Sequence, residues 1–302
     1  MKKDVQSSAP GRSLLGQAAP YRDWTRLQMH LVWCYDGPVQ RLEQEVPAQF
    51  GCISAWLLRR GAARISIGRR TWHQEAGQWL IAPPRARHQR FSADNHLLSV
   101  TIFAAWMHRL PLFDHDEVLV IPAAEHAHLE AMAERLVRQA RSLSRGAHHN
   151  LLVNEVSFHN FLRIAEACPR WLETIVELLL ERGCVPRTYP GLDARVLRAI
   201  QFMEAWDLSQ PLTNTRVAAA VGTSVSTLIT LFREAVQTTP LAYYDRIRQE
   251  VAGHALMERG ASLKEVSRAL GFAHAPNFTR WFRRQQGVSP REFQRQMTRP
   301  GR

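Results

Sequence analysis

The sequence predicts an α+β protein: a small β-barrel of the jelly-roll type with flanking helices, then an all-α region of two helix-turn-helix modules joined by a long helix. Three patterns carry this prediction. Short apolar stretches separated by Gly and Pro fill residues 21–122, as in closely spaced strands. The apolar period becomes helical in residues 123–183, and one helical pattern then occurs twice in residues 193–302. A chain of 302 residues can hold two domains, each with its own core.

The N-terminal part begins with residues that are poorly suited to a core. Residues 1–20 are rich in Ser, Pro, Gly and Ala, and we expect a mobile tail there. The predicted barrel, residues 21–122, follows. Its expected strands are Cys52–Leu58, Ala63–Gly68, Gln78–Ala82, Gln89–Phe91 and His96–Phe103. The interior of such a barrel often holds one small ligand.

Four side chains of the predicted barrel are candidates for a ligand site: Trp56, Arg64, Trp79 and His88. Alternation along a strand turns half of the side chains inward, so those that fall in predicted strands could line a cavity. Tryptophans that only fill the core explain the pattern at least as well. Both interpretations stay open at this point.

Residues 123–183 are predicted to be helical. One apolar stripe consists of Leu129, Met132, Leu136, Ala140 and Leu143. A second helical region is expected from about Asn150 to Cys168, and Pro169 is expected to open a further helix. Two prolines and a glycine make residues 184–192 the predicted linker between domains.

The C-terminal region, residues 193–302, is predicted to contain helices only. The expected helices are Asp193–Trp206, Thr213–Val221, Ser224–Val236, Pro240 to about Glu258, Ser262–Leu270, and one from about Pro276. Ser262 and Glu265 have the spacing of a capping box, and Gly271 is expected to end that short helix in a left-handed conformation. Pro276 suits a first helical position because its missing N–H needs no partner there.

Two of these short helix pairs repeat one another. Val217–Gly222 matches Val266–Gly271 at a spacing of 49, and Phe232 matches Phe282 at a spacing of 50. A repeat that keeps apolar anchors and the turn glycine in step is strong evidence for two equivalent modules. In each module the second helix has a polar outer face, which suits the major groove of DNA.

The stretch Gly271–Phe293, GFAHAPNFTRWFRRQQGVSPREF, resembles the signature of the AraC-type (AraC/XylS) family of bacterial transcription regulators. The resemblance is close over residues 193–302 and loose before them. It implies a regulator, more often an activator, whose N-terminal domain senses a small molecule. It also implies that helices such as those of residues 123–183 pair two protomers into a homodimer, and it makes RNA polymerase a candidate partner.

Residues 77–88, GQWLIAPPRARH, resemble the second half of a cupin motif, which implies a cupin-like barrel. A metal-binding cupin would also supply an HxH…E cluster, and residues 59–66 contain none. His88 alone cannot meet the three-ligand requirement of a catalytic metal. The four cysteines have no CxxC spacing, so buried free thiols are expected. We therefore predict no metal, no other cofactor and no catalytic site.

The candidate DNA contacts follow from the outer faces of the two predicted recognition helices. Base-reading candidates are Asn277 and Arg280 in the second module and Ser226 and Thr230 in the first. Candidates for binding DNA phosphates are Arg233, Arg283, Arg284, Arg291 and Arg295. For any single arginine, an ordinary solvated surface residue is an equally good explanation.

The charge distribution agrees with a nucleic-acid partner. The formal net charge is +12, and the end of the chain carries arginines at 280, 283, 284, 291, 295, 299 and 302 against Glu292 alone. Such clustering is typical of a phosphate-binding face, although the net charge by itself is also explained by solubility.

No apolar run approaches the length of a membrane span, and the N-terminus lacks the apolar core of a secretory signal, so a cytoplasmic protein without membrane contact is expected. Two alternatives to an effector-controlled regulator stay open. One is a metal-dependent cupin enzyme fused to a DNA-binding domain, and the other is an architectural DNA-binding protein without an effector. The sequence names neither the effector nor the operator.

Overall fold

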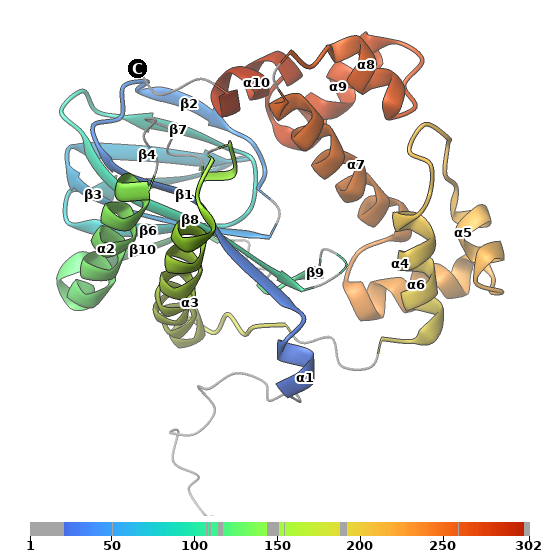
Figure 1. Cartoon of the computed structure of the whole chain (residues 1–302), viewed down its shortest axis with the longest axis horizontal. Helices are drawn as coiled ribbons and strands as arrows, with labels where there is room; N and C mark the ends of the chain where they lie inside the picture. Colours follow the sequence, from blue (N-terminus) through green and yellow to red (C-terminus); the bar gives the residue numbers. More distant parts are fainter. Residues whose placement is uncertain are drawn as a thin grey trace, which may run out of the picture.

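The computed structural model describes residues 21–49, 51–106, 108, 110–113, 117–143, 151–153, 155–187, 192–258 and 260–298. The predicted tail at residues 1–20 lies outside these ranges, as do residues 188–191 of the predicted linker and Arg299 and Arg302 of the arginine cluster. In the described part, an N-terminal half of sheets and helices precedes a C-terminal half of helices only (Figure 1).

Two antiparallel sheets form the N-terminal half. The larger sheet has the order β1-β8-β3-β6-β10, with β9 on β8; its strands are β1 Leu27–Gly37, β3 Cys52–Arg60, β6 Gln78–Ala82, β8 His96–Trp106, β9 Leu110–Pro111 and β10 Leu119–Pro122. The smaller sheet has the order β2-β7-β4-β5; its strands are β2 Glu43–Val46, β4 Ala62–Ile67, β5 Arg70–Glu75 and β7 Arg87–Phe91. Strands β3, β4, β6, β7 and β8 confirm the five that the sequence predicted.

The two described sheets do not close into one barrel, so the predicted jelly-roll β-barrel is corrected to a two-layered sandwich. A barrel needs an unbroken ladder of hydrogen bonds around its circumference. The chain changes sheet at Gly77, between β5 and β6, and these two strands do not pair. Side chains supply the contacts there instead. Gln74 Nε2 donates to the Gln78 carbonyl at 2.8 Å, and Gln78 Oε1 accepts from the Glu75 N–H at 2.8 Å.

Alternation along the strands divides the apolar residues of the larger sheet between two cores. On β3, Trp56 and Leu58 point toward the smaller sheet and pack in one core with Ile65 and Phe91. Leu57, between them, belongs to the core on the opposite face of the sheet. Because both faces of β3 are buried, its sequence is a continuous apolar run and not an alternating one.

Helices α2 (Ala127–Leu143) and α3 (Phe158–Glu181) cover the outer face of the larger sheet (Figure 1). Leu129, Leu136 and Ala140 are buried, which confirms the predicted stripe of α2 where the structure describes it. The short elements of this half are α1 Tyr21–Trp24, η2 Ala123–His126 and η3 Leu151–Val153.

The predicted helix start at Pro169 is wrong, because this proline lies inside α3. A proline within a helix removes one hydrogen bond and strains the preceding turn. Here the apolar face continues across it, with Cys168, Trp171 and Ile175 all buried against the sheet side. Packing of that continuous face outweighs the local cost, as is usual for helices in folded proteins.

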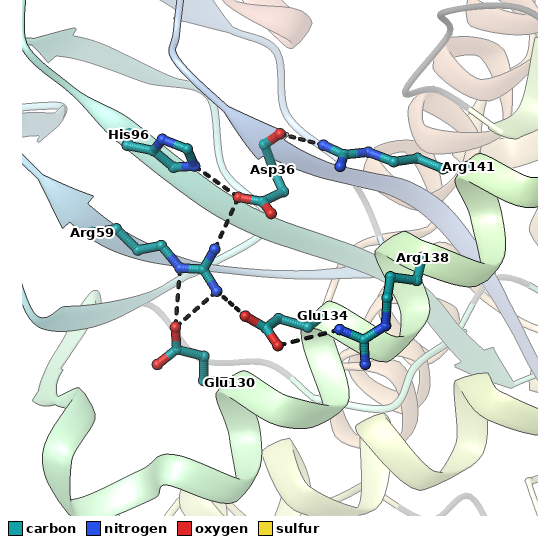
Figure 2. A network of polar contacts seen from close by, with 7 residues as sticks. All are labelled: Asp36, Arg59, His96, Glu130, Glu134, Arg138 and Arg141. Carbon is teal, nitrogen blue, oxygen red and sulfur yellow. Dashed lines mark hydrogen bonds and ion pairs between the residues drawn. The ribbon is translucent and has the colours of Figure 1, made fainter.

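Charged side chains connect α2 to one end of strands β1, β3 and β8 of the larger sheet (Figure 2). Arg59 on β3 forms ion pairs with Asp36 at 3.1 Å, Glu130 at 2.8 Å and Glu134 at 2.5 Å. His96 Nε2 lies 2.9 Å from the same Asp36 carboxylate. Burial alone would lower the pKa of Arg59, but its hydrogen bonds to the glutamates and the charge of Asp36 raise it above its ordinary value.

The C-terminal half consists of α4 Ala194–Glu204, α5 Asn214–Ala220, α6 Val225–Val236, α7 Pro240–Met257, α8 Leu263–Ala269, α9 Ala275–Gln286 and α10 Pro290–Thr298. Local capping explains several of the starts. The side chains of Thr213, Ser224 and Thr239 each accept a hydrogen bond from a backbone N–H in the first turn of α5, α6 and α7. The predicted capping box is wrong, because Ser262 is the N-cap of α8 but makes no side-chain capping bond.

All four cysteines are free, as the spacing predicted. Cys34 and Cys168 are buried, but Cys52 and Cys184 are only partly buried, which corrects the expectation that all four thiols are buried. Burial raises the pKa of the Cys34, Cys52 and Cys168 thiols to about 12. These thiols therefore stay protonated near neutral pH.

Candidate nucleic-acid interface

The first module is the helix pair α5–α6, whose axes differ in direction by 88°. Gly222 lies in the turn with a φ of +67°, a backbone conformation that L side chains rarely adopt. Leu228 and Phe232 on α6 are fully buried and hold the helix against α4 and α7. The structure therefore presents a helix-turn-helix with its second helix exposed on one side.

On that exposed side of α6 lie Ser226, Thr230 and Arg233, the three residues that the sequence assigned to DNA. Ser226 Oγ lies 3.0 Å from the hydroxyl of Ser224, the N-cap of α6. The exposed surface of α6 is thus short-chained and uncharged apart from Arg233 and Glu234. It offers fewer paired hydrogen bonds to base edges than a helix with Arg or Asn at these positions.

The second module is the pair α8–α9. Phe278 and Phe282 on α9 are fully buried, and Trp281 beside them is buried as well. Asn277, Arg280 and Arg284 are exposed on the opposite face, as their helical spacing predicted. In the described part of the chain Arg280 forms no ion pair and donates no side-chain hydrogen bond, so its guanidinium is free to bind an external acceptor.

A residue that the sequence did not single out positions this module. Arg248 on α7 lies 4.5 Å from the ring centroid of Phe272 and 4.9 Å from that of Trp281. Its Nη2 also donates to the carbonyl of Leu270, at the C-terminal end of α8, at 2.8 Å. A cation at that end of a helix is favourable. The helical spacing could have identified this residue, because Arg248 lies four residues after the buried Tyr244 and four before the buried Ala252.

The turn of the second module touches the loop that precedes the first module. Gly271 has a φ of +74°, and a Cβ added there would lie 2.7 Å from the backbone oxygen of Ser209, in the loop between α4 and α5. Only glycine allows this approach without a backbone shift. The two modules are therefore connected by α7 and also by this contact.

Helix α7 separates the two recognition helices. The buried residues of α5 and α6 belong to the core that includes the N-terminal domain, whereas those of α8 and α9 form a separate core around Phe278 and Phe282. Figure 1 shows the two modules at opposite ends of α7. Eighteen residues of α-helix span roughly 27 Å. The separation is of the order of one turn of B-DNA, about 34 Å.

The predicted phosphate-binding arginines differ in their surroundings. Arg283, Arg284 and Arg291 are exposed. Arg295 forms an ion pair with Glu292, which also pairs with Arg41 of the N-terminal domain at 2.6 Å. A DNA phosphate would have to compete with this carboxylate for Arg295, so the other four, which include the exposed Arg233 of α6, are the better candidates.

The four predicted ligand residues do not come together. Trp56 lies between the two sheets, and Trp79 is fully buried on the opposite face of the larger sheet, toward the helices. Arg64 is exposed, and His88 lies on the outward face of β7 between the inward-facing Arg87 and Gln89. A shift of one residue along a strand turns a side chain to the opposite face of the sheet. The sequence alone does not fix this register, so it could not show which of these side chains face the same space.

The described residues contain no group of three His, Cys, Asp or Glu side chains that could hold a metal ion. None of the described helices alone is long and apolar enough to cross a membrane. The bent pair α5–α6 meets the length and composition requirement only when its two helices are counted together.

Two helix pairs joined by a glycine turn, each with a buried apolar face and an exposed polar recognition helix, define a helix-turn-helix DNA-binding domain. In agreement, residues 217–296 match the family model described as a helix-turn-helix domain. The C-terminal domain of the chain is an AraC-type helix-turn-helix domain, as the signature between Gly271 and Phe293 predicted.

The similarity to named proteins is concentrated in this domain. The HTH-type transcriptional regulator ArgR of Pseudomonas aeruginosa is 30% identical over 102 residues, which cover 34% of this chain and 31% of ArgR. The chain thus spans about a third of the length of this curated relative. A solved transcriptional regulator with an AraC-type DNA-binding domain, from Chromobacterium violaceum, is 31% identical, with a TM-score of 0.33, over 35% of this chain and 95% of its own.

A longer match is structural only. The structure of ToxT from Vibrio cholerae covers 89% of this chain and 98% of its own, with 11% identity and a TM-score of 0.49. A likeness at that level carries no conclusion about what the N-terminal sandwich binds.

Proposed function

We propose that this chain is a sequence-specific DNA-binding transcription regulator, controlled by a small molecule bound between the two sheets of its N-terminal domain. One observation carries the proposal: two equivalent helix-turn-helix modules lie at opposite ends of one helix, α7, with their polar recognition faces exposed. A rigid helix fixes the separation of the modules, which suits two successive major grooves on one side of the DNA.

In the proposed complex the second module reads bases and the first contributes less. Arg280 can donate two hydrogen bonds to guanine, and Asn277 can bond both donor and acceptor edges of adenine. Ser226 and Thr230 can reach single acceptors or a thymine methyl. Arg233, with Arg283, Arg284, Arg291 and Arg295, is proposed to hold phosphates, which sets the register of the protein without choosing the sequence.

Contacts between the domains offer a physical route for control. On the helices that flank the first module, Tyr243 of α7 donates its hydroxyl to the backbone oxygen of His108 at 2.6 Å, and His108 Nδ1 lies 2.8 Å from Glu204 on α4. The N-terminal domain also contacts α10, the helix that follows the second module, through the ion pair between Arg41 and Glu292. A ligand that binds one arrangement of the domains more tightly would shift the equilibrium between DNA-competent and incompetent forms. Activation, contact with RNA polymerase and a cytoplasmic location are proposed from the family resemblance.

The spacing of the binding site tests the proposal. DNA selected from a random pool by the full chain is expected to show two protected major grooves about one helical turn apart. Inserting five base pairs between them moves one half-site to the opposite side of the DNA, and we expect affinity to fall about 100-fold because one module loses its specific contacts. The same insertion outside the footprint is the control. Equal affinities for DNA with the insertion inside and outside the footprint would refute the proposal that both modules read DNA. A selected pool without any enriched sequence would favour an architectural protein.

We also propose a homodimer formed by the N-terminal part of α3. Phe158, Phe161 and Leu162 share one helix face and are 74%, 50% and 49% exposed. The two phenylalanine rings stack with centroids 6.4 Å apart. Exposed apolar patches of this kind mark protein interfaces more often than isolated exposed residues do.

Replacing Phe158 and Phe161 together by serine is expected to turn the dimer into a monomer, as measured by sedimentation equilibrium. Aromatic anchors at the centre of an interface typically contribute about 2 kcal/mol or more each, so the dimer dissociation constant should rise at least about 100-fold. Val185→Ser, which changes an apolar residue that is 49% exposed outside α3, serves as the control and should leave the dimer intact. A double variant that dimerises like the wild type would place the interface elsewhere.

A further inference from the structure

Arg87 is the only charged side chain that is buried in the described part of the chain. It begins β7 and is 6% exposed, with its guanidinium 5.3 Å from the ring centroid of Trp56 on the opposite sheet. Its Nε and Nη1 are buried and have no hydrogen-bond partner. An arginine therefore lies between the two sheets with donors that nothing in the described protein accepts.

No described carboxylate pairs with this guanidinium. Burial lowers the pKa of Arg87 to about 10, so it still carries its charge at neutral pH. A buried charge without a partner is costly, and proteins normally pair such groups or neutralise them. The Trp56 ring compensates only partly, because a cation over a ring contributes about 0.5–2 kcal/mol.

The side chains around Arg87 divide the interior of the sandwich into a polar end and an apolar end. Ser54, which precedes Trp56 by two residues on the same face of β3, is buried, and Thr101 Oγ1 donates to its hydroxyl at 3.1 Å. Gln89 shares the inward face of β7 with Arg87 and is buried as well. Beyond Trp56 most of the buried side chains are apolar, namely Leu58, Ala63, Ile65, Leu80, Ala82, Phe91, Leu97 and Val118. The buried Gln74 is an exception, and its Oε1 accepts from Trp56 Nε1 at 2.8 Å.

We propose that the sandwich binds a small monocarboxylate with an apolar or aromatic body, whose carboxylate accepts hydrogen bonds from Arg87 and whose body packs on Trp56. A single buried cation matches one negative charge, and the planar guanidinium matches a planar carboxylate. The neighbouring Ser54, Thr101 and Gln89 are polar groups suited to the same end of the ligand. That this ligand is the effector of a regulator rests on the function proposed above. That it binds in the sandwich does not depend on that function.

The position of Arg87 also connects this site to the second DNA-binding module. Ala86, the preceding residue, touches the C-terminal end of α9: a Cβ added at Gly287 would lie 2.9 Å from the Cβ of Ala86. A ligand that moves Arg87 would therefore also move its neighbour Ala86, which contacts the C-terminal end of the recognition helix α9.

Thermal unfolding of the full chain without DNA tests the proposal with acetate, benzoate and 1-naphthoate as probes. Benzamide and 1-naphthamide have nearly the same shapes as the two aromatic acids but carry no charge. At saturating concentration, at least one aromatic carboxylate is expected to raise the Tm of the wild type by about 3–6 °C more than its amide does. Because no DNA is present, the result is independent of whether the chain regulates transcription.

Arg87→Met should abolish this difference and raise the carboxylate dissociation constant about 100-fold in calorimetry. Arg90→Met is the matched control, since Arg90 lies on the same strand with its side chain exposed, and it should respond like the wild type. Without ligand, Arg87→Met should unfold no earlier than the wild type, because it removes an unpaired buried charge. If Arg87→Met does not fold, Arg87→Gln, which keeps hydrogen-bond donors without the charge, replaces it.

Two results would overturn the proposal. One is that no carboxylate of the panel stabilises the wild type more than its amide. The other is that the selective stabilisation persists in the Arg87 variant. In either case Arg87 would be a structural residue held by Trp56.

Discussion

Arg280→Ala is expected to lose discrimination at one base pair of the operator while binding to unrelated DNA changes little. Arg280 is exposed on α9, and no described side chain pairs with its guanidinium or competes with a base for it. A bidentate contact between arginine and guanine discriminates against the wrong base by about 1–3 kcal/mol, which is roughly 5- to 150-fold in affinity. Competition binding with operators altered at each position would identify the base pair.

Arg284→Ala is the matched control for this experiment. Arg284 lies one helical turn after Arg280 and is also exposed, but it is proposed to bind phosphate. Its removal should weaken binding to all sequences by a similar factor. The number of counterions released on binding, measured from the salt dependence of affinity, should fall by about one. If Arg280→Ala instead weakened all sequences equally, Arg280 would be a phosphate contact and the base-reading role would fall to Asn277.

The same reasoning predicts an uneven operator. The exposed face of α6 presents Ser226 and Thr230, where α9 presents Asn277 and Arg280. Hydroxyl groups on short side chains make single, less selective bonds to bases. The half-site bound by the second module should therefore tolerate fewer substitutions than the half-site bound by the first.

Gly271→Ala is expected to destabilise the C-terminal domain more than Gly222→Ala does, although the two glycines occupy equivalent turns of the repeat. Both have a positive φ, +74° and +67°, so a Cβ costs about 1–2 kcal/mol at either position. At Gly222 the added Cβ would meet nothing within 4 Å, whereas at Gly271 it would lie 2.7 Å from the Ser209 backbone oxygen. Overpacking of this kind typically costs a further 1–3 kcal/mol or so.

Urea denaturation of the two variants measures this difference directly. The contact at Ser209 also joins the second module to the loop before the first, so Gly271→Ala should in addition lower affinity for the two-site operator. Gly222→Ala, measured under the same conditions, serves as the control for backbone strain alone. Equal losses of unfolding free energy in the two variants would show that the contact between the modules adds nothing to stability.

Much of the C-terminal domain could be predicted from the sequence because its signals are local. The caps Thr213 and Ser224, the turn glycine at 271 and the inward faces around Phe232 and Phe282 all follow from helical spacing and backbone preference. The repeat reinforced each of these signals with a second copy. Where a local signal failed, at Ser262, the N-cap position was right and only the side-chain bond was absent.

The N-terminal domain was predicted less well for a physical reason. Both faces of β3 and β8 are buried, so their apolar runs do not say which residue faces which core. Trp56 and Trp79 consequently looked alike in the sequence but lie on opposite faces of one sheet. The predicted helix start at Pro169 was wrong for a related reason, because the packing that keeps α3 continuous comes from elements distant in the chain.

The sequence by itself determined the kind of DNA-binding domain, its two modules and the polar faces they expose, since periodicity, capping and repetition depend on near neighbours. Only the tertiary structure decided which side chains meet across long distances in the chain. It placed Arg87 against Trp56 with no counter-charge from any described residue, paired Glu292 with Arg41, and brought Gly271 close to Ser209. Such contacts arise from how sheets and helices pack, and packing is a property of the whole fold that no local pattern contains.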